Sequence, residues 1–148
     1  MSDGRHGKVM VFPTPSVMPA LLSLLVLDER LRKLRYGTAL AIYAAILIMG
    51  SLPGARAEIG TVASGIVLHS LAYGVITFLL FTGSLGSARE RAVKSVLSVM
   101  VMGALDELVQ SFLPYRSGAI GDWLVDCNAA LITAGLLWAF LPQTARSR

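Results

Sequence analysis

The chain has 148 residues, of which 55% are hydrophobic and only 15% are charged, and its formal net charge is +4. Soluble domains carry about 25% charged residues, so this composition excludes an ordinary soluble domain and indicates a membrane protein of one domain. The basic residues stand in short runs beside apolar segments, which is typical of membrane orientation rather than of nucleic-acid binding. The one cysteine, Cys127, excludes an intramolecular disulfide.

Residues 1–33 form an apolar and basic N-terminal segment. Within it, residues 9–27 are apolar, but Pro13, Pro15 and Pro19 interrupt the first half, and proline breaks helices. We expect an interfacial or membrane-associated helix here, and a fifth membrane span or a signal-like anchor remains open. No small-residue cleavage site followed by a polar domain is evident, which argues against a removed signal peptide.

Four long apolar runs predict membrane-spanning helices at residues 36–52, 59–81, 93–113 and 121–141. At about 1.5 Å per residue, each helix is close to the roughly 30 Å of hydrocarbon that it must cross. A polar loop at 83–91 separates the second run from the third.

The expected fold class is therefore all-α, an integral membrane four-helix bundle with an additional N-terminal interfacial helix. The four-helix domain covers residues 34–141, and residues 142–148 form a cytoplasmic tail.

The distribution of basic residues predicts the orientation of the chain. With four spans and a cytoplasmic N-terminus, only Arg56 and Arg116 lie outside. The other eleven of the thirteen basic residues lie inside: Arg5, Lys8, Arg30, Arg32, Lys33, Arg35, Arg89, Arg91, Lys94, Arg146 and Arg148. This bias follows the positive-inside rule. It places both termini in the cytoplasm and the Arg116 loop at the periplasm or exterior.

A polar cluster lies across the join of the third and fourth apolar runs. Four of the nine acidic residues of the chain fall between positions 106 and 128, although an ionised side chain within a membrane costs about 2.5–3.5 kcal/mol on insertion scales. By the helical rise, the second span contributes His69 at a depth of about 15 Å, and the acids of the other spans lie about 8–10 Å deep. The candidate residues are His69, Tyr73, Asp106, Glu107, Gln110, Arg116, Asp122, Asp126 and Asn128.

Two interpretations of this cluster remain open. It is either a buried network that holds the helices together, or a polar pocket open to the outer face that binds a headgroup, an ion or a proton. The acids outnumber the nearby cations, and uncompensated buried charge is expensive, which favours the pocket. No zinc spacing, nucleophile elbow or dinucleotide fingerprint is present, and we expect no metal and no cofactor.

The residues from Asp106 to Arg116, DELVQSFLPYR, followed by Asp122 to Asp126, DWLVD, resemble the signature of the VanZ-like family. His69 and Tyr73 resemble its His-x-x-x-Tyr, and the resemblance covers about residues 34–141. The chain departs from the pattern in lacking a lysine just before the His69 segment and in having Ala129 or Ala130 where the family usually has glycine. The resemblance implies a small bacterial inner-membrane protein linked to the envelope, to teicoplanin and to antibiotic resistance, without implying a settled biochemical activity.

Three functions follow as hypotheses. The first is an outward polar pocket that engages an envelope lipid or a lipid-linked headgroup, with Arg116 as anion contact, Glu107 and Asp126 as pocket carboxylates, and Gln110 and Asn128 as positioners. The second is a membrane-embedded hydrolase or transferase that uses His69 with Glu107 or Asp106. The third is a non-catalytic structural partner of another membrane protein. The expected partners are thus membrane lipids and, for the third hypothesis, a membrane protein, but not nucleic acid.

Overall fold

The computed structural model describes residues 28–54, 63–116 and 118–141. These ranges contain a short 3-10 helix, η1 (Glu29–Leu31), and four long helices: α2 (Arg32–Gly50), α4 (Gly65–Gly83), α5 (Ala88–Ser111) and α6 (Ile120–Phe140). They contain no strand, which confirms the all-α fold class. The predicted interfacial helix at 9–27 and the tail at 142–148 lie outside the described residues.

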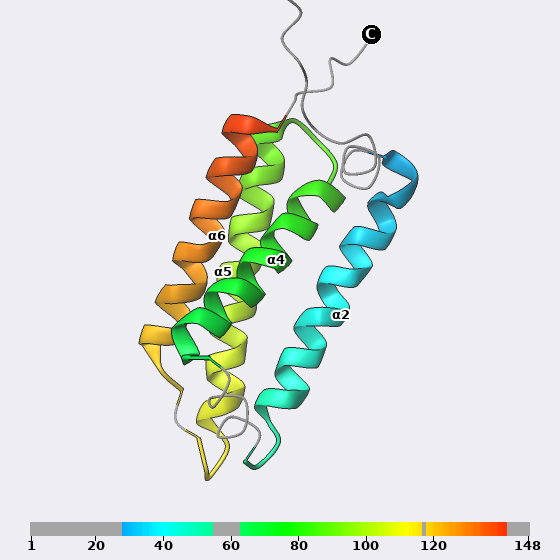
Figure 1. Ribbon diagram of the computed structural model, residues 1–148. Coiled ribbons are helices and arrows are strands. Elements are labelled where there is room, and N and C mark those ends of the chain that lie inside the picture. The colour runs from blue at the N-terminus through cyan, green and yellow to red at the C-terminus, as the bar shows by residue number, and fades with distance from the viewer. Residues whose placement is uncertain (1–27, 55–62, 117, 142–148) are drawn as a thin grey trace, which may run out of the picture.

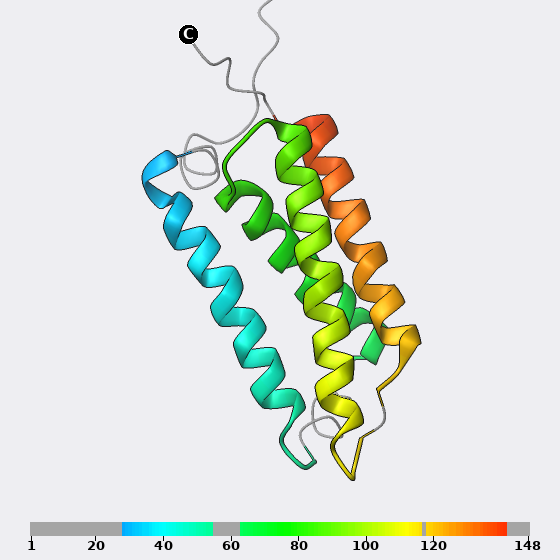
Figure 2. The same cartoon turned by 180° about the vertical axis from the view of Figure 1, so that it is seen from behind.

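Successive helices run in opposite directions, so that α2 begins and α6 ends at the same end of the molecule (Figure 1). Helix α4 crosses the group obliquely. Its Gly65 end lies beside α6, and its Gly83 end lies beside α2, as the views from both sides show (Figures 1 and 2). The space between α2 and α4 therefore widens toward the end where α2 finishes and α4 begins.

Local capping sets two helix boundaries that differ from those expected. Helix α5 begins at Ala88, inside the predicted polar loop, because Ser87 and Glu90 form a capping box that satisfies the first backbone N–H groups. Arg89 and Arg91 are therefore helical. Helix α4 begins at Gly65 rather than near residue 59, since Ser64 is its N-cap and accepts a hydrogen bond from Val67 N–H. Residues 59–62 lie outside the described ranges.

The core lies along α4. Tyr73, Ile76 and Leu80 are fully buried there, and they pack against Ala39 of α2, Val99 of α5 and Ala130 of α6. At its end, α4 approaches α2 so closely that a Cβ on Gly83 would lie 2.8 Å from the backbone N of Tyr36. Glycine is needed at this crossing.

Polar side chains tie the helices together through backbone carbonyls. Buried Arg35 of α2 donates from Nε and Nη2 to Thr82 O in the last turn of α4, at 3.3 and 3.0 Å. Tyr43 Oη donates to Met102 O at 3.0 Å, and Trp123 Nε1 donates to Met100 O at 2.9 Å. Helix α5 is thus held from α2 on one side and from α6 on the other.

Large apolar side chains cover much of the outer surface. Exposed examples occur on every long helix, among them Ile48, Leu71, Val101 and Leu131. Within the described residues, two helices, α4 and α6, are long and apolar enough to cross a membrane. Helices α2 and α5, for which spans were also predicted, do not meet this criterion; both begin with a basic turn, at Arg32–Arg35 and Arg89–Lys94.

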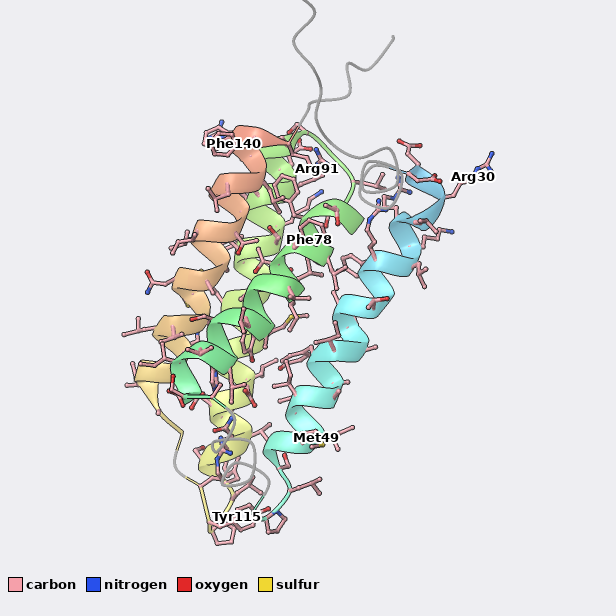
Figure 3. The ribbon with its side chains drawn as sticks, viewed as in Figure 1. Arg30, Met49, Phe78, Arg91, Tyr115 and Phe140 are labelled. Atoms are coloured by element: carbon pink, nitrogen blue, oxygen red, sulfur yellow. The ribbon has the colours of Figure 1, made fainter. Side chains whose placement is uncertain are left out.

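Charge separates the two ends of the molecule. Arg30 and Arg91 lie at the end where α6 finishes near Phe140, whereas Met49 and Tyr115 lie at the opposite end (Figure 3). The side chains at the Tyr115 end include the predicted polar cluster. We name these the basic end and the polar end.

Candidate functional site

The polar end is built where α4 and α6 begin and α2 and α5 finish. Three helices, α4, α5 and α6, and the segment after α5 contribute polar side chains. The burial is unusual: Asp106 is 2% exposed, Gln110 3% and Asp126 0%. Groups so deeply buried need partners, and most of them have one.

His69 joins α4 to α6. Its Nδ1 lies 2.9 Å from Asp126 Oδ1, and its Nε2 lies 3.9 Å from Asp122 Oδ2. Both ring nitrogens therefore face carboxylate oxygens. The Asp126 contact fixes the orientation of the imidazole ring.

A second carboxylate is held by tyrosine. Tyr73 Oη donates to Asp106 Oδ2 at 3.3 Å, which links α4 to α5. One turn apart on α4, the His69 and Tyr73 rings are stacked with their centroids 6.0 Å apart. The two aromatic rings thus form one surface that presents Asp126 on one side and Asp106 on the other.

Gly103 makes room for the buried Asp126. A Cβ at position 103 would lie 2.9 Å from Asp126 Oδ2 and 3.1 Å from Trp123 Cδ1. Because α5 has no side chain here, α6 can approach and insert its carboxylate between the helices. Gly103, Asp106 and Gln110 are buried on one face of α5.

Arg116 closes this end of the molecule. Its Nη2 donates to Gln110 Oε1, and its Nη1 donates to Gly50 O at 3.5 Å, in the last turn of α2. Tyr115 Oη beside it donates to Ser51 O at 2.6 Å. Arg116 thus contacts an amide and one carbonyl group of α2, and it forms no salt bridge with a carboxylate of the described residues.

Glu107 holds the start of α6. Its Oε2 accepts a hydrogen bond from Ala119 N–H, at the N-cap of that helix. The backbone is tight at this point, since a Cβ on Gly118 would lie 2.5 Å from Glu107 O. Glu107 therefore positions the loop that carries Arg116, while its other oxygen stays available.

Five of the nine candidate side chains line one cavity. The cavity has a volume of about 300 Å³ and is lined by residues of α2, α4 and α5 and by Arg116. Ile46, Met49, Leu68 and Ala72 form its apolar wall, while His69, Tyr73, Asp106, Gln110 and Arg116 form its polar wall. A molecule with an apolar and a polar part would match both.

Some buried polar atoms at this end have no protein partner. Within the described ranges, Asp126 Oδ2, Glu107 Oε1 and Arg116 Nε make no hydrogen bond. Such atoms are costly to bury without a partner. They give the polar end unused capacity to accept and donate hydrogen bonds.

Asn128 does not join the cluster. It is exposed, and its Nδ2 donates to Leu124 O of its own helix at 2.7 Å. Residues 126 and 128 point to nearly opposite sides of a helix of 3.6 residues per turn, so the structure does not bring Asn128 together with the other candidates. The remaining eight candidates lie at the polar end.

Two contributors escaped the sequence reasoning. Gly103 has no side chain and contributes space. Gly50 and Ser51, at the end of α2, contribute their backbone carbonyl oxygens. The spacing of Gly103 three residues before Asp106 was an available signal. No group of three residues able to hold a metal occurs within the described residues.

No protein-family model, no curated protein and no solved structure matches this chain.

Proposed function

We propose that this chain is a VanZ-like, multi-pass protein of the bacterial inner membrane whose outward pocket binds the headgroup of an envelope lipid or lipid-linked molecule. In this arrangement the polar end faces the periplasm or exterior, both termini lie in the cytoplasm, and the four long helices form the membrane bundle. A contribution to glycopeptide tolerance would follow from that binding.

The exposure of the apolar helices supports the membrane setting. A core helix of a soluble protein is mostly buried. By contrast, only 33% of the apolar segment of α4 and 22% of the apolar segment of α6 are buried. Contiguous apolar surface of this extent is expected in contact with lipid. The concentration of basic side chains at the other end agrees with the positive-inside rule.

The observation that carries the proposal is the cavity with two kinds of wall. Its apolar side chains come from α2 and α4, between which an acyl chain would enter. Its polar side chains, His69, Asp106, Gln110 and Arg116, meet the headgroup. Arg116 is the anion contact, because a guanidinium forms strong hydrogen bonds with phosphate.

Lipid identification by native mass spectrometry tests this function. The wild type should retain a specific lipid, and Asp106→Asn, which keeps the size of the side chain, and Arg116→Ala should lose it. Asn128→Ala is the matched control, since Asn128 is polar and exposed but lies away from the cavity, and it should retain the lipid. Identical lipid profiles in all four proteins would contradict a binding pocket.

A second function is supported by the His69–Asp126 contact. A carboxylate that orients a histidine is the arrangement used for general acid–base catalysis, and His69 lines the cavity. Here Asp126 takes the place that the sequence assigned to Glu107 or Asp106. Turnover of labelled envelope lipids by the purified protein, lost in His69→Gln and Asp126→Asn, would establish an enzyme.

The third hypothesis, a structural partner of another membrane protein, uses the same network without a ligand. It predicts stoichiometric co-purification of a membrane protein and no specific lipid. The lipid profiles described above separate it from the pocket.

A further inference from the structure

A second cavity lies at the basic end of the molecule. Its volume is about 690 Å³, and it is lined by the first turns of α2, by the connection between α4 and α5, and by the first half of α5. It is therefore separated from the cavity beside His69 by most of the length of the helices. The function proposed above does not use it.

Three cations line this cavity: Arg32 and Lys33 from α2, and Lys94 from α5. Three acids lie near this end, Asp28, Glu29 and Glu90, and none of them lines the cavity. Asp28 accepts a hydrogen bond from Arg30 N–H at 2.8 Å, and Glu90 accepts one from Ser87 N–H at 2.9 Å. Within the described ranges, no salt bridge joins any of the three cations to a carboxylate. The cavity thus holds an excess of positive charge.

Hydroxyl groups add neutral donors to the same wall. Tyr36, Ser84 and Ser98 line the cavity beside the cations. Lys94 Nζ donates one hydrogen bond, to Leu85 O at 3.0 Å, and an ammonium group has three N–H donors. Ammonium, guanidinium and hydroxyl donors around one space match the oxygens of a phosphate group.

The cavity also continues into apolar surface. Leu85 and Leu97 line it and are 59% and 56% exposed, and Val101, one turn further along α5, is 60% exposed. A ligand whose phosphate lies among the cations can therefore place an acyl chain along α5. This continuity favours a lipid over a free anion.

We propose that this cavity binds the phosphodiester headgroup of an anionic phospholipid in the leaflet at the basic end. Basic pockets between membrane helices on the cytoplasmic side hold anionic headgroups in this way. The site is independent of the cavity beside His69, and either can exist without the other.

Lipid retention by the full-length protein tests the site. Wild type reconstituted in nanodiscs of equal phosphatidylglycerol and phosphatidylcholine should retain phosphatidylglycerol preferentially in native mass spectra. Because each basic residue near a membrane surface contributes about fivefold to the binding of anionic lipid, Lys33→Gln with Lys94→Gln should reduce the preference by roughly 25-fold. The charge-retaining pair Lys33→Arg with Lys94→Arg should keep most of it.

Arg89→Gln is the matched control. Arg89 is an exposed basic residue at the same end but does not line the cavity, so its loss should leave the preference nearly unchanged. An equal reduction by Arg89→Gln, or no reduction in the double glutamine variant, would overturn the proposal. Binding of inorganic phosphate in phosphatidylcholine nanodiscs, without any preference for phosphatidylglycerol, would assign the cavity to a soluble anion and also overturn it.

Discussion

His69 and Asp126 show how one buried carboxylate is accommodated between helices. The imidazole Nδ1 supplies a partner 2.9 Å from Asp126 Oδ1, and the missing side chain at Gly103 supplies the space. The acid is fully buried, so both conditions are needed. Loss of the His69 contact or of the space at Gly103 should therefore disturb the buried Asp126 carboxylate.

Gly103→Ala should therefore disturb the site without removing a polar group. The new Cβ would lie 2.9 Å from Asp126 Oδ2, and overpacking of this kind costs about 1–3 kcal/mol. We expect a melting temperature in detergent lower by several degrees, together with weaker lipid retention. Thermal unfolding followed by circular dichroism measures the first effect.

Gly135→Ala on α6 is the control for this substitution. Nothing lies within 4 Å of a Cβ at that position, and alanine favours a helix over glycine. Its melting temperature should stay the same or rise. Equal effects of the two substitutions would mean that Asp126 is not packed against α5 as described.

At the scale of whole elements, the divergence of α2 and α4 creates the proposed pocket. The two helices are in backbone contact at Gly83 and Tyr36 and are joined there by Arg35 to Thr82 O. From this contact they separate toward the polar end, where Arg116 reaches across to Gly50 O. The crossing point therefore determines the width of the cavity.

Gly83→Ala should push α2 away from α4. The added Cβ would lie 2.8 Å from Tyr36 N and 3.1 Å from Tyr36 Cα, and backbone atoms cannot move aside as a flexible side chain does. We expect a loss of about 1–3 kcal/mol of stability, measured as a lower melting temperature. Gly37→Ala, where nothing lies within 4 Å, should have little effect; a stable Gly83→Ala protein would rule out the close crossing.

The helices themselves were predictable because long apolar runs and their prolines or glycines mark them directly. Most of the site was predictable from helical spacing. A repeat of 3.6 residues places Asp122 and Asp126 on one helix face, and Asp106 and Gln110 on one face of another helix. Asn128 was the exception, although its spacing from Asp126 already indicated a different face.

The pairing within the site was not predictable. That His69 contacts Asp126 rather than Glu107 depends on the rotation and separation of α4, α5 and α6, which periodicity within one helix does not contain. The capping by Glu107 of the α6 start, and the binding of Arg116 to Gly50 O, are also long-range consequences of packing. The start of α5 at Ala88, in contrast, is determined by local sequence, and the Ser87–Glu90 capping box indicates it directly.

At the scale of the whole molecule, the proposed membrane setting can be tested at exposed apolar positions. Leu131 on α6 is 58% exposed, and Leu85 in the connection at the basic end is 59% exposed. In water, arginine would be tolerated at both positions. In a bilayer only Leu85 lies near the aqueous boundary.

Leu131→Arg should therefore prevent accumulation in the membrane, because arginine in the middle of a span costs about 2.5–3.5 kcal/mol on insertion scales. Leu85→Arg should accumulate at the level of the wild type. Immunoblots of membrane fractions measure both. Normal levels of a folded Leu131→Arg protein would argue against α6 as a span.

The most direct test of the account is the side of the membrane on which the polar end lies. In a Cys127→Ala background, single cysteines at Pro114, beside Arg116, and at Arg89, in the first turn of α5, mark the two ends. A membrane-impermeant maleimide added to intact cells should label position 114 and spare position 89 until the cells are opened. Labelling of position 89 alone would mean that the orientation is opposite to the proposed one, and it would contradict an outward pocket.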